Sequence, residues 1–548
     1  MLRPDDIRAI PLFSSLAESE LAHLAQTSAD LHLQPGEFAV PEGGERAIFA
    51  VLDGKIEVVK TFDGVERRLG FRMPGTIFGE VPMTLGTPFP GGYRAIEPSR
   101  VIRIEPRDYY AIAAASPAVA TKIGALARER IGGLAGITSE APKPRVTMIG
   151  HRFDAECSTL RQFLARNQIT YEWMTPDAPE VAAHWSGGLP SDGDCPALRL
   201  MDGTLLVRPV ARDLAERLGL QTKPRLSDYD TVIIGGGPGG LAAAVYGASE
   251  GLSTLVIERE APGGQAGTSS RIENYLGFPS GVSGDELASR ALQQSKRLGA
   301  EIVVTRSVAR LDPRTRHVHL DGDEVIRART VILATGVAWR RLAIDGFDRL
   351  IGKGVYYGAA RSEAVGTQGL DVHLIGGGNS AGQAALYFAN HARSITLVVR
   401  GDSLAKGMSR YLVEQLAAKS NIRVQLRSEV VAAHGDTHLG AIDIRDETSV
   451  VQRHDCGALF VFIGADAETA WLPAEIARDA RGYVLTGDVV VKASRWPLER
   501  DPYLLETSVP GIFACGDVRL SPVKRVASAV GEGSMAIAFV HKYLQQTQ

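Results

Sequence analysis

A glycine-rich stretch at residues 231–240, which reads TVIIGGGPGG, decides the fold of the C-terminal part of this chain. Its first four residues form a short apolar run typical of a buried strand, and the helical pattern LAAA at residues 241–244 follows the glycines directly. A second apolar run, STLVI at residues 253–257, ends in Glu258, which comes 23 residues after Gly235. A strand, a glycine turn, a helix and a strand in this order are typical of a doubly wound α/β sheet.

Each polar or glycine position of this unit suits a dinucleotide. Gly235 allows the tight turn, and Gly237 lets the backbone approach a pyrophosphate. Gly240 lets the helix pack closely while its N-terminal amides face the anion. Glu258 is placed to accept hydrogen bonds from a ribose. The sequence therefore predicts a dinucleotide-binding site at this loop.

The same pattern recurs later in the chain. The apolar run VHLI at residues 372–375 enters GGGNSA at residues 376–381, and the strand-like run ITLVV follows at residues 395–399. No acid ends this second strand; Arg400 comes next, with Lys406 nearby. Cationic side chains suit a ribose 2′-phosphate, which favours NADPH over NADH. The alternative is that both cations are solvated surface charges.

Several separate motifs agree with the two loops. They are GGQ at residues 263–265, IENY at 272–275, ATG at 334–336 and IFACGD at 512–517. With these motifs, residues 226–548 resemble the low-molecular-weight thioredoxin reductase branch of the pyridine nucleotide-disulfide oxidoreductase family. Cys515 within the last motif is expected to be a small buried hydrophobe.

The resemblance implies FAD at the first loop, NADPH at the second, and a homodimer. It also implies an NADPH-binding domain, residues 343–459, inserted into an FAD-binding domain, residues 226–342 and 460–548, and able to rotate against it. The residues expected at FAD are Gly235, Gly237, Pro238, Gly240, Glu258, Gly264, Gln265, Asn274, Val308, Ala334, Thr335, Gly336, Gly516, Asp517, Lys524, Arg525, Val526 and Ala527. Those expected at NADPH are Gly376, Gly378, Asn379, Ser380, Ala381, Arg400 and Lys406.

The chain departs from this family where the redox disulfide, Cys-x-x-Cys, follows a Gly-Val pair. Residues 354–361 read GVYYGAAR, so Gly358 and Arg361 stand at the two cysteine positions. Neither residue can form a mixed disulfide. Reduction of the flavin by NADPH needs no cysteine, so that half of the chemistry survives. Arg361 either fills space or pairs with an acid, or it acts beside the flavin.

A second module is expected over residues 145–220. It resembles a thioredoxin or glutaredoxin fold, with strand-like runs at residues 146–149 and 169–173 on either side of a helical pattern. Where such folds carry CxxC, residues 154–157 read DAEC. Cys195-Pro196 stands where those folds keep a cis-proline. Cys157 and Cys195 could then form a redox couple, and the alternative is two unconnected buried thiols.

The N-terminal module, residues 1–135, reads as a small β-barrel or jelly roll with flanking helices. Short apolar runs separated by turns predict its strands, for example at residues 48–52 and 101–104. Residues 134–146, which include two prolines, have linker composition.

This module resembles a cyclic nucleotide-binding domain through PGE at residues 35–37, LDG at 52–54 and FGE at 78–80. Glu80 matches the acid that holds the ribose hydroxyl in that family. Phe89 stands where the family has its phosphate-binding arginine, and an aromatic ring cannot replace that bidentate donor. Arg94 is the nearest substitute. A barrel kept for packing or partner contact is therefore favoured over one that binds cyclic AMP.

Composition excludes several classes of protein. The chain has 548 residues, 60 basic and 63 acidic, for a net charge of −3, so nothing indicates a nucleic-acid partner. No apolar run is long enough to suggest a membrane span, and the acidic N-terminus is unlike an export signal, so we expect a cytoplasmic protein. None of the four cysteines forms a CxxC pair, so neither a disulfide framework nor a metal site is expected.

These observations predict a multidomain NADPH-dependent FAD oxidoreductase whose flavin passes electrons directly to an unidentified acceptor. No catalytic acid or nucleophile is identifiable. One alternative is disulfide reduction through Cys157 and Cys195. Another is a redox or nucleotide sensor with little turnover.

Overall fold

A computed structural model of the chain describes residues 2–62, 65–138, 144–178, 181, 185, 190–269, 271–279, 281–358, 363–364, 366–493, 495–521 and 523–547. The chain divides into two compact units, residues 1–145 and 146–548. Among the described residues no single helix has the length and apolar character needed to cross a membrane. The two helical segments Asp108–Ala115 and Ala118–Arg130, which meet at a sharp bend, have the required length and apolar character only when they are taken together.

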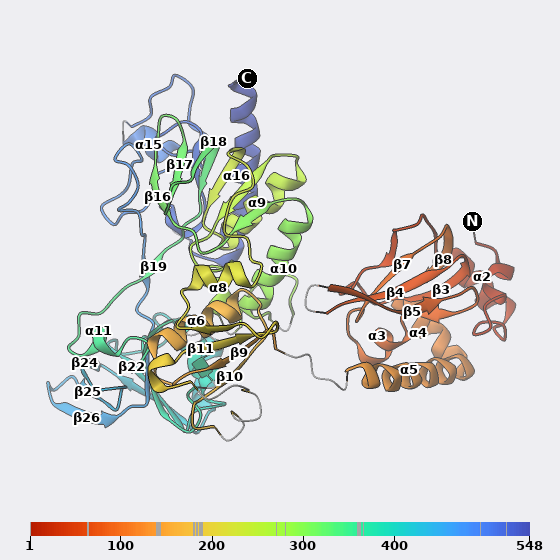
Figure 1. Ribbon diagram of the computed structural model, residues 1–548, viewed down its shortest axis with the longest axis horizontal. Helices are drawn as coiled ribbons and strands as arrows, with labels where there is room; N and C mark the ends of the chain where they lie inside the picture. Colours follow the sequence, from red (N-terminus) through yellow and green to blue (C-terminus); the bar gives the residue numbers. More distant parts are fainter. Residues whose placement is uncertain are drawn as a thin grey trace. The chain divides into compact units, whose positions relative to one another are not determined.

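The first unit is built around two antiparallel four-stranded sheets (Figure 1). One sheet has the order β1 (Ala29–Leu33), β8 (Ser99–Ile104), β3 (Ile48–Asp53) and β6 (Ile77–Phe78). The other has the order β2 (Phe38–Val40), β7 (Gly92–Ala95), β4 (Ile56–Phe62) and β5 (Val65–Arg72). The helices are α1 (Pro4–Arg8), α2 (Glu18–Thr27), α3 (Glu80–Leu85), α4 (Pro106–Ala115) and α5 (Pro117–Thr138).

The linker predicted over residues 134–146 begins later than expected, because α5 continues to Thr138. The two glycines at residues 132 and 133 lower the helix propensity of this stretch, yet the helix runs through them. Residues 139–143 lie outside the described part of the chain.

The second unit begins with a small α/β layer, residues 146–220, called here the middle module. Its sheet has the order β10 (Tyr171–Met174), β9 (Val146–Ile149), β11 (Ala197–Leu200) and β12 (Leu205–Val207). Strand β9 runs parallel to β10 and antiparallel to β11. Its helical elements are α6 (Ala155–Arg166), η1 (Asp192–Asp194) and α8 (Ala211–Arg217). The Cys195–Pro196 peptide bond before β11 is cis.

A seven-stranded sheet forms the centre of what we call the first nucleotide domain. The order is β15 (Glu301–Val303), β14 (Thr254–Ile257), β13 (Asp228–Ile234), β18 (Val325–Leu333), β17 (His317–Leu320) and β16 (Val308–Leu311), with β29 (Ile512–Ala514) also paired to β18. Its helical elements are α9 (Pro238–Ser249), η2 (Ala266–Thr268), α10 (Gly284–Arg297), α15 (Asp488–Lys492), η3 (Gly516–Val518) and α16 (Val526–Gln546). Strands β14, β13 and β18 are parallel, as the strand–helix–strand pattern predicts.

The second nucleotide domain has a parallel sheet of order β20 (Val355–Tyr357), β27 (Ala458–Val461), β21 (Asp371–Ile375), β22 (Ser394–Val399) and β23 (Ile422–Leu426). A three-stranded sheet, β24 (Glu429–His434), β25 (Ala441–Arg445) and β26 (Val451–Asp455), accompanies it, with helices α11 (Phe347–Leu350), α13 (Asn379–Phe388) and α14 (Arg410–Ala417). Because β27 pairs with β21 along its whole length and with β20 from Leu459 onward, this sheet continues past the expected domain boundary at residue 459 to Val461.

Candidate functional site

The first glycine loop is held open at the start of a helix. Gly235 has a φ of +105°, and a Cβ on Gly240 would overlap the Gly235 carbonyl oxygen. A Cβ on Gly237 would meet only the Gly264 Cα, at 3.9 Å. Helix α9 begins directly after Gly237, and no side chain caps its first amides. These amides therefore form an uncovered cradle that fits a pyrophosphate.

Glu258 stands at the end of β14, as predicted. Its carboxylate is buried, and each oxygen accepts one amide hydrogen bond, from Gly236 N at 2.7 Å and from Glu260 N at 2.8 Å. Burial raises the pKa of Glu258, and these two amides act in the opposite direction. Each carboxylate oxygen keeps a second acceptor position, which a ribose hydroxyl can use.

Other predicted residues gather around this loop. Gly263 N donates to Gly236 O at 2.8 Å, and a Cβ on Gly264 would lie 3.0 Å from the Gly237 Cα. The Gln265 amide donates to the Val337 carbonyl, directly after the ATG motif of residues 334–336.

Two further predicted residues, Val308 and Asn274, lie outside the glycine loop. Val308 follows the turn in which the Arg306 amide donates to the Glu258 carbonyl at 3.0 Å. Asn274 is exposed within residues 271–279, and the described residues include no hydrogen bond from it to the first loop.

The C-terminal motif forms a second side of this site. Burial raises the pKa of Asp517 and lowers that of Lys524. Lys524 Nζ donates to the carbonyls of Asp517 and Arg519, at 2.8 and 2.7 Å. Helix α16 starts at Val526 with no side chain capping its first turn, so its amides are also uncovered. Ala527 lies in that first turn.

Sequence reasoning missed the ion pair that supports this motif. Glu532 accepts from Gly516 N at 2.7 Å and forms an ion pair with Arg519. Arg519 also bonds Thr486 Oγ1 at 3.3 Å. An acid on the buried face of α16, an otherwise largely apolar helix, is the signal that could have pointed to it.

The second loop has the same open geometry. Gly376 has a φ of +141°, and a Cβ on it would overlap the Phe462 carbonyl oxygen. Helix α13 begins after Gly378 without a side-chain cap, and a Cβ on Gly378 would meet only Gly407 O, at 3.9 Å. Asn379 Oδ1 accepts from Ser409 N at 2.7 Å. In the first turn Ser380 is exposed and Ala381 is buried.

The two candidate phosphate-binding cations differ in their surroundings. Arg400 is exposed directly after β22. Lys406 Nζ already pairs with Asp402 Oδ1 at 2.7 Å, and Lys406 is the main cause of the lowered pKa of Asp402. Arg400 is therefore the stronger candidate for a 2′-phosphate.

An aromatic ring lies against the place where the family has its first redox cysteine. Gly358 has a φ of +80°, and a Cβ on it would lie 3.0 Å from Trp339 Nε1. A cysteine there would be strained and would meet the indole. Arg361, at the second cysteine position, lies outside the described residues.

The thiols of the middle module are buried. Cys157 N donates to Asp154 Oδ1 at 2.8 Å at the start of α6, and Cys157 has no exposed surface. Burial, followed by the Asp154 charge, raises its pKa. Cys195 is 4% exposed, and neither thiol forms a disulfide. Since the thiolate is the reactive form, Cys157 is a poor nucleophile.

Aromatic side chains fill the N-terminal barrel. The Phe78 ring stacks on Phe49 at 4.9 Å and on Tyr93 at 4.3 Å, and Phe89 packs edge-on against both of those outer rings. Phe89 is 2% exposed, so it is part of the core and not of a phosphate site.

The polar groups of this barrel are also engaged. Glu80 Oε2 lies 2.8 Å from Arg130 Nη1 of α5, an ionic contact without hydrogen-bond alignment. Arg94, the candidate substitute for the phosphate arginine, pairs with Glu57 and Glu66. Neither side chain is available to a ligand without breaking an ion pair.

Comparison with known proteins places these features in a family. The family model described as pyridine nucleotide-disulphide oxidoreductase matches residues 229–533, and that of the cyclic nucleotide-binding domain matches residues 30–116. Thioredoxin reductase from Treponema pallidum (strain Nichols) is 32% identical over 324 residues, covering 59% of this chain and 99% of that protein. The enzyme from Bacillus subtilis (strain 168) is 31% identical over 324 residues, covering 58% and 96%.

A solved structure supports the same family assignment as these sequence relatives. The crystal structure of Lactococcus lactis thioredoxin reductase (FR conformation) superposes with a TM-score of 0.52 at 28% identity, covering 58% of this chain and 99% of that chain. Thioredoxin reductases use FAD and NADPH, and the uncovered helix starts after Gly237 and Gly378 fit both groups. The chain therefore belongs to the pyridine nucleotide-disulphide oxidoreductase family, as a thioredoxin reductase-like, NADPH-dependent flavoprotein with an N-terminal cyclic nucleotide-binding domain.

Proposed function

We propose that this enzyme passes electrons from NADPH through FAD to an acceptor that meets the flavin directly, without a thiol relay. The observation that carries the proposal is the packing of Gly358 against Trp339. Both nucleotide loops are open, whereas the disulfide position is taken by a glycine against an indole. The entry of electrons is therefore retained and their usual exit is lost.

The chain's residues would divide the work as follows. A bound FAD would supply the redox chemistry, since a flavin can take up a hydride and release electrons singly or in pairs. The uncovered amides of α9 would bind the FAD pyrophosphate, and Glu258 would bind its ribose. The uncovered amides of α13 would bind the NADPH pyrophosphate, and Arg400 would select its 2′-phosphate.

The middle module supports this proposal because its thiols are buried and Cys157 is a poor nucleophile. Its parallel and antiparallel strand pairs and its helix capped by Asp154 support a thioredoxin-like fold as part of this proposal. We assign it that fold but no redox turnover, since Cys157 is buried and its pKa is raised. Disulfide reduction through Cys157 and Cys195 is the alternative that this burial disfavours.

The test is oxidation of NADPH by the purified holoenzyme against a panel of acceptors: oxygen, quinones, ferredoxin, thioredoxin and small disulfides. We expect turnover with at least one acceptor other than a disulfide, unchanged in the Cys157→Ala and Cys195→Ala variants. Loss of turnover in either variant would support the thiol route. Stopped-flow mixing with NADPH must also bleach the flavin; a flavin that stays oxidised would favour a sensor with little turnover and refute the proposal.

A further inference from the structure

A narrow ribbon connects the two nucleotide domains. It consists of β19 (Ala338–Trp339) and β28 (Ala465–Asp466), which pair antiparallel, and the bidentate ion pair of Arg340 with Asp466 lies beside them. Figure 1 shows β19 on this thin connection between the upper and lower parts of the second unit. Domains joined in this way are expected to move relative to each other unless another contact restrains them.

The middle module packs firmly on the first nucleotide domain. One continuous apolar cluster contains Val146, Leu160 and Leu198 of the module together with Ile233 and Val256 of that domain. A shared core of this kind resembles the interior of a single domain more than a transient interface. The module therefore moves with the first nucleotide domain.

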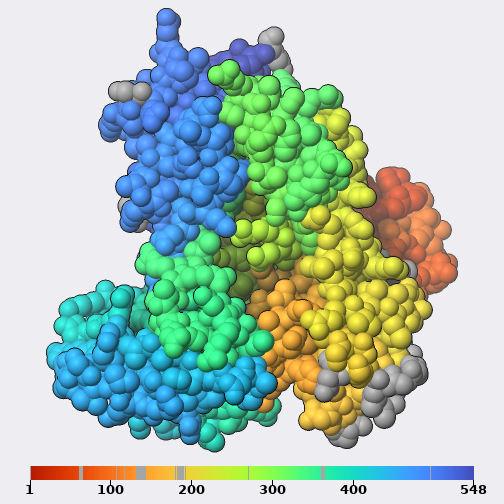
Figure 2. Space-filling model, turned by 60° about the vertical axis from the view of Figure 1, so that its left-hand side comes forward, coloured from red at the N-terminus to blue at the C-terminus, as the bar shows by residue number. Residues whose placement is uncertain are grey.

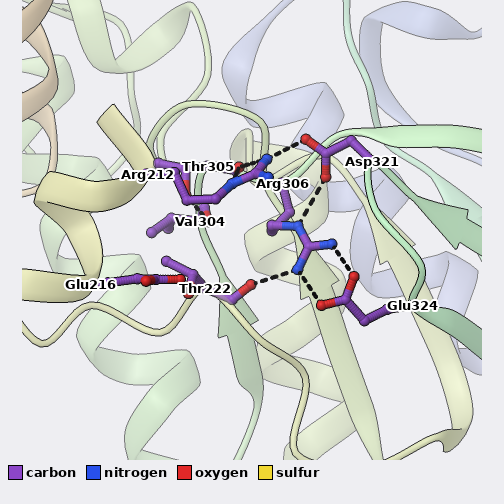
Figure 3. A network of polar contacts seen from close by, with 8 residues as sticks. All are labelled: Arg212, Glu216, Thr222, Val304, Thr305, Arg306, Asp321 and Glu324. Carbon is purple, nitrogen blue, oxygen red and sulfur yellow. Dashed lines mark hydrogen bonds and ion pairs between the residues drawn. The ribbon is translucent and has the colours of Figure 1, made fainter. Parts of the chain in front are cut away.

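Polar contacts close the same interface (Figure 3). Arg212 of α8 donates to the Thr305 carbonyl, at 2.7 Å from Nη2, and pairs with Asp321. Arg306, 3% exposed, bonds Asp321 at 2.9 Å and Glu324 at 2.8 Å, and its Nη1 donates to the Thr222 carbonyl. Arg212 thus links the module to the first nucleotide domain, and the buried Arg306 guanidinium, held by three partners, fixes the segment that Arg212 contacts.

The other side of the module contacts the second nucleotide domain. Arg152 Nε donates to the Gly366 carbonyl at 2.7 Å, and the Phe153 ring stacks on His438 with centroids 4.8 Å apart. A Cβ on Gly352 would lie 2.8 Å from the Cβ of Ala155, so the two backbones approach closely there. Figure 2 shows the orange part of the module beside the green residues near 350 and the blue residues of this domain.

A buried charged pair lies at the centre of this second contact. Arg161 of the module and Glu363 of the second nucleotide domain are 1% and 3% exposed, and Nη2 lies 3.6 Å from Oε2. Ser158 Oγ and Gln162 Nε2 donate to Glu363 Oε1 at 3.1 and 3.2 Å. The Arg161 guanidinium also lies 4.1 Å from the Trp173 ring centroid.

Glu363 is the main compensation for this buried cation. Within the described residues Arg161 Nε and Nη1 have no hydrogen-bond partner. Arg161 and Glu363 lie on opposite sides of this contact, so each keeps its counter-charge only where the two surfaces meet in this register. A charge buried in another register without its partner would be strongly unfavourable, so the pair selects this orientation of the two surfaces.

From these contacts we propose that the middle module is a brace that holds the second nucleotide domain in one orientation relative to the first. The module shares an apolar core with the first nucleotide domain, and it forms an ion pair and hydrogen bonds with the second. Residues 154–157 belong to the brace itself, and Gly358 belongs to the second nucleotide domain that the brace holds. The proposal does not depend on the identity of the electron acceptor.

Pulsed electron paramagnetic resonance tests the brace in the full-length holoenzyme. Because all four native cysteines are buried, nitroxide labels would attach selectively to Asp323→Cys on the first nucleotide domain and Gln415→Cys on the second, both exposed positions. We expect one narrow distance distribution. The variant Arg152→Ala with Ser158→Ala removes hydrogen bonds to the second domain, and we expect about a twofold broader distribution from it.

Two further variants make the test specific. Glu363→Gln removes the carboxylate and leaves Arg161 without its counter-charge in the joined arrangement, so it should also broaden the distribution. Arg393→Ala removes an exposed ion pair with Asp371 inside the second domain and should leave the distribution narrow. An unchanged distribution in both brace variants, or a broad one in the parent protein, would overturn the proposal.

Hydrogen exchange provides a readout that is independent of turnover. Peptides from β20 and from residues 366–370 should exchange about tenfold faster in the brace variants than in the parent or in Arg393→Ala. This result is expected even if the flavin proves inert toward NADPH, so failure of the proposed function and failure of the brace can be told apart. Equal exchange in all variants would contradict the brace.

Discussion

The chain contains two kinds of nucleotide-recognition fold, and they have diverged in opposite directions. In the two dinucleotide loops the backbone is uncovered: a Cβ on Gly237 or on Gly378 would meet a single neighbouring atom, at 3.9 Å, and the helices behind them have no side-chain caps. In the N-terminal barrel the corresponding space is full. Phe89 replaces a charged donor, and Arg130 already neutralises Glu80.

We expect from this difference that the barrel keeps its fold without binding a cyclic nucleotide. A dinucleotide loop binds mainly through backbone amides, so its function persists as long as no side chain covers it. A cyclic nucleotide site that depends on two charged side chains would be closed by one substitution and one new ion pair. The predictions below test each side of this contrast.

Closing the first loop should have the largest effect. In Gly240→Ala the new Cβ overlaps the Gly235 carbonyl oxygen, so α9 must move away from β13. We expect nearly complete loss of bound FAD, measured by absorbance of the purified protein, and destabilisation by more than about 4 kcal/mol. Gly531→Ala in α16, where a Cβ meets nothing within 4 Å, should stay yellow. A yellow Gly240→Ala protein would contradict the role given to the loop.

Opening the barrel should cost stability without creating a binding site. Phe89→Ala removes a ring that is 2% exposed, and we expect about 3–5 kcal/mol of destabilisation in the first unit. Hydrogen exchange of peptides within residues 2–138 measures it. Phe38→Ala, at a side chain that is 40% exposed, should cost less than about 1 kcal/mol.

Calorimetric titration sharpens the same point. Neither the parent protein nor Phe89→Arg should give heat with cyclic AMP or cyclic GMP, because Glu80 stays paired with Arg130. Saturable heat from the parent protein would show that the barrel opens on its own and would remove the contrast between the two folds.

Acid should destabilise the sheet that carries the second loop. Burial, and then the neighbouring His454, lower the pKa of His373 in β21 to about 4, from an ordinary value of 6.5. The unfolded chain therefore binds more protons between these values. The contribution of His373 to stability is complete above pH 6.5 and is lost as the pH falls toward 4, by about 3 kcal/mol.

Urea denaturation of the protein at pH 7.5 and at pH 5 measures this loss. Unfolding of the second nucleotide domain is monitored by hydrogen exchange of peptides from β21 and β22. His373→Leu should remove most of the pH dependence, whereas His32→Asn, at a ring that is 69% exposed, should not. If His373→Leu keeps the parent slope, another group must be responsible.

Removing the phosphate-selecting cation should have the smallest effect. A charge-assisted hydrogen bond contributes about 1.5–3 kcal/mol, so Arg400→Ala should raise the KM for NADPH by about 10- to 100-fold and leave that for NADH unchanged. Lys406→Ala should change it less, because Lys406 already pairs with Asp402. Steady-state kinetics with both nucleotides checks this; equal effects on NADPH and NADH would mean that Arg400 does not contact the 2′-phosphate.

Local patterns predicted the parts of this molecule that depend on local sequence. The strands, helices and glycine turns around residues 231–257 and 372–399 are observed because strand period, glycine position and helix start all lie within one short segment. The family, its use of FAD and NADPH, and the N-terminal cyclic nucleotide-binding domain are confirmed. The extension of α5 to Thr138 was not predicted, because glycine and proline content is a weak guide to where a helix ends.

What the sequence could not predict depends on residues far apart in the chain. Arg161 and Glu363 are about 200 positions apart, and nothing local marks either as the partner of the other. The same holds for Glu80 with Arg130 and for Trp339 against Gly358. Only the fold brings these groups together, and they decide which inherited sites still work.

The pairing of β19 with β28 has a consequence for protein engineering. The chain leaves the first nucleotide domain through β19 and returns to it through the neighbouring antiparallel strand β28. Ala338 lies opposite Asp466, and Trp339 lies opposite Ala465. Excision between these strands would leave two chain ends about 5 Å apart, a gap that a two-residue turn spans. The β19–β28 pair is thus a suitable site for domain replacement, because another domain could be inserted there without cutting a strand of the seven-stranded sheet.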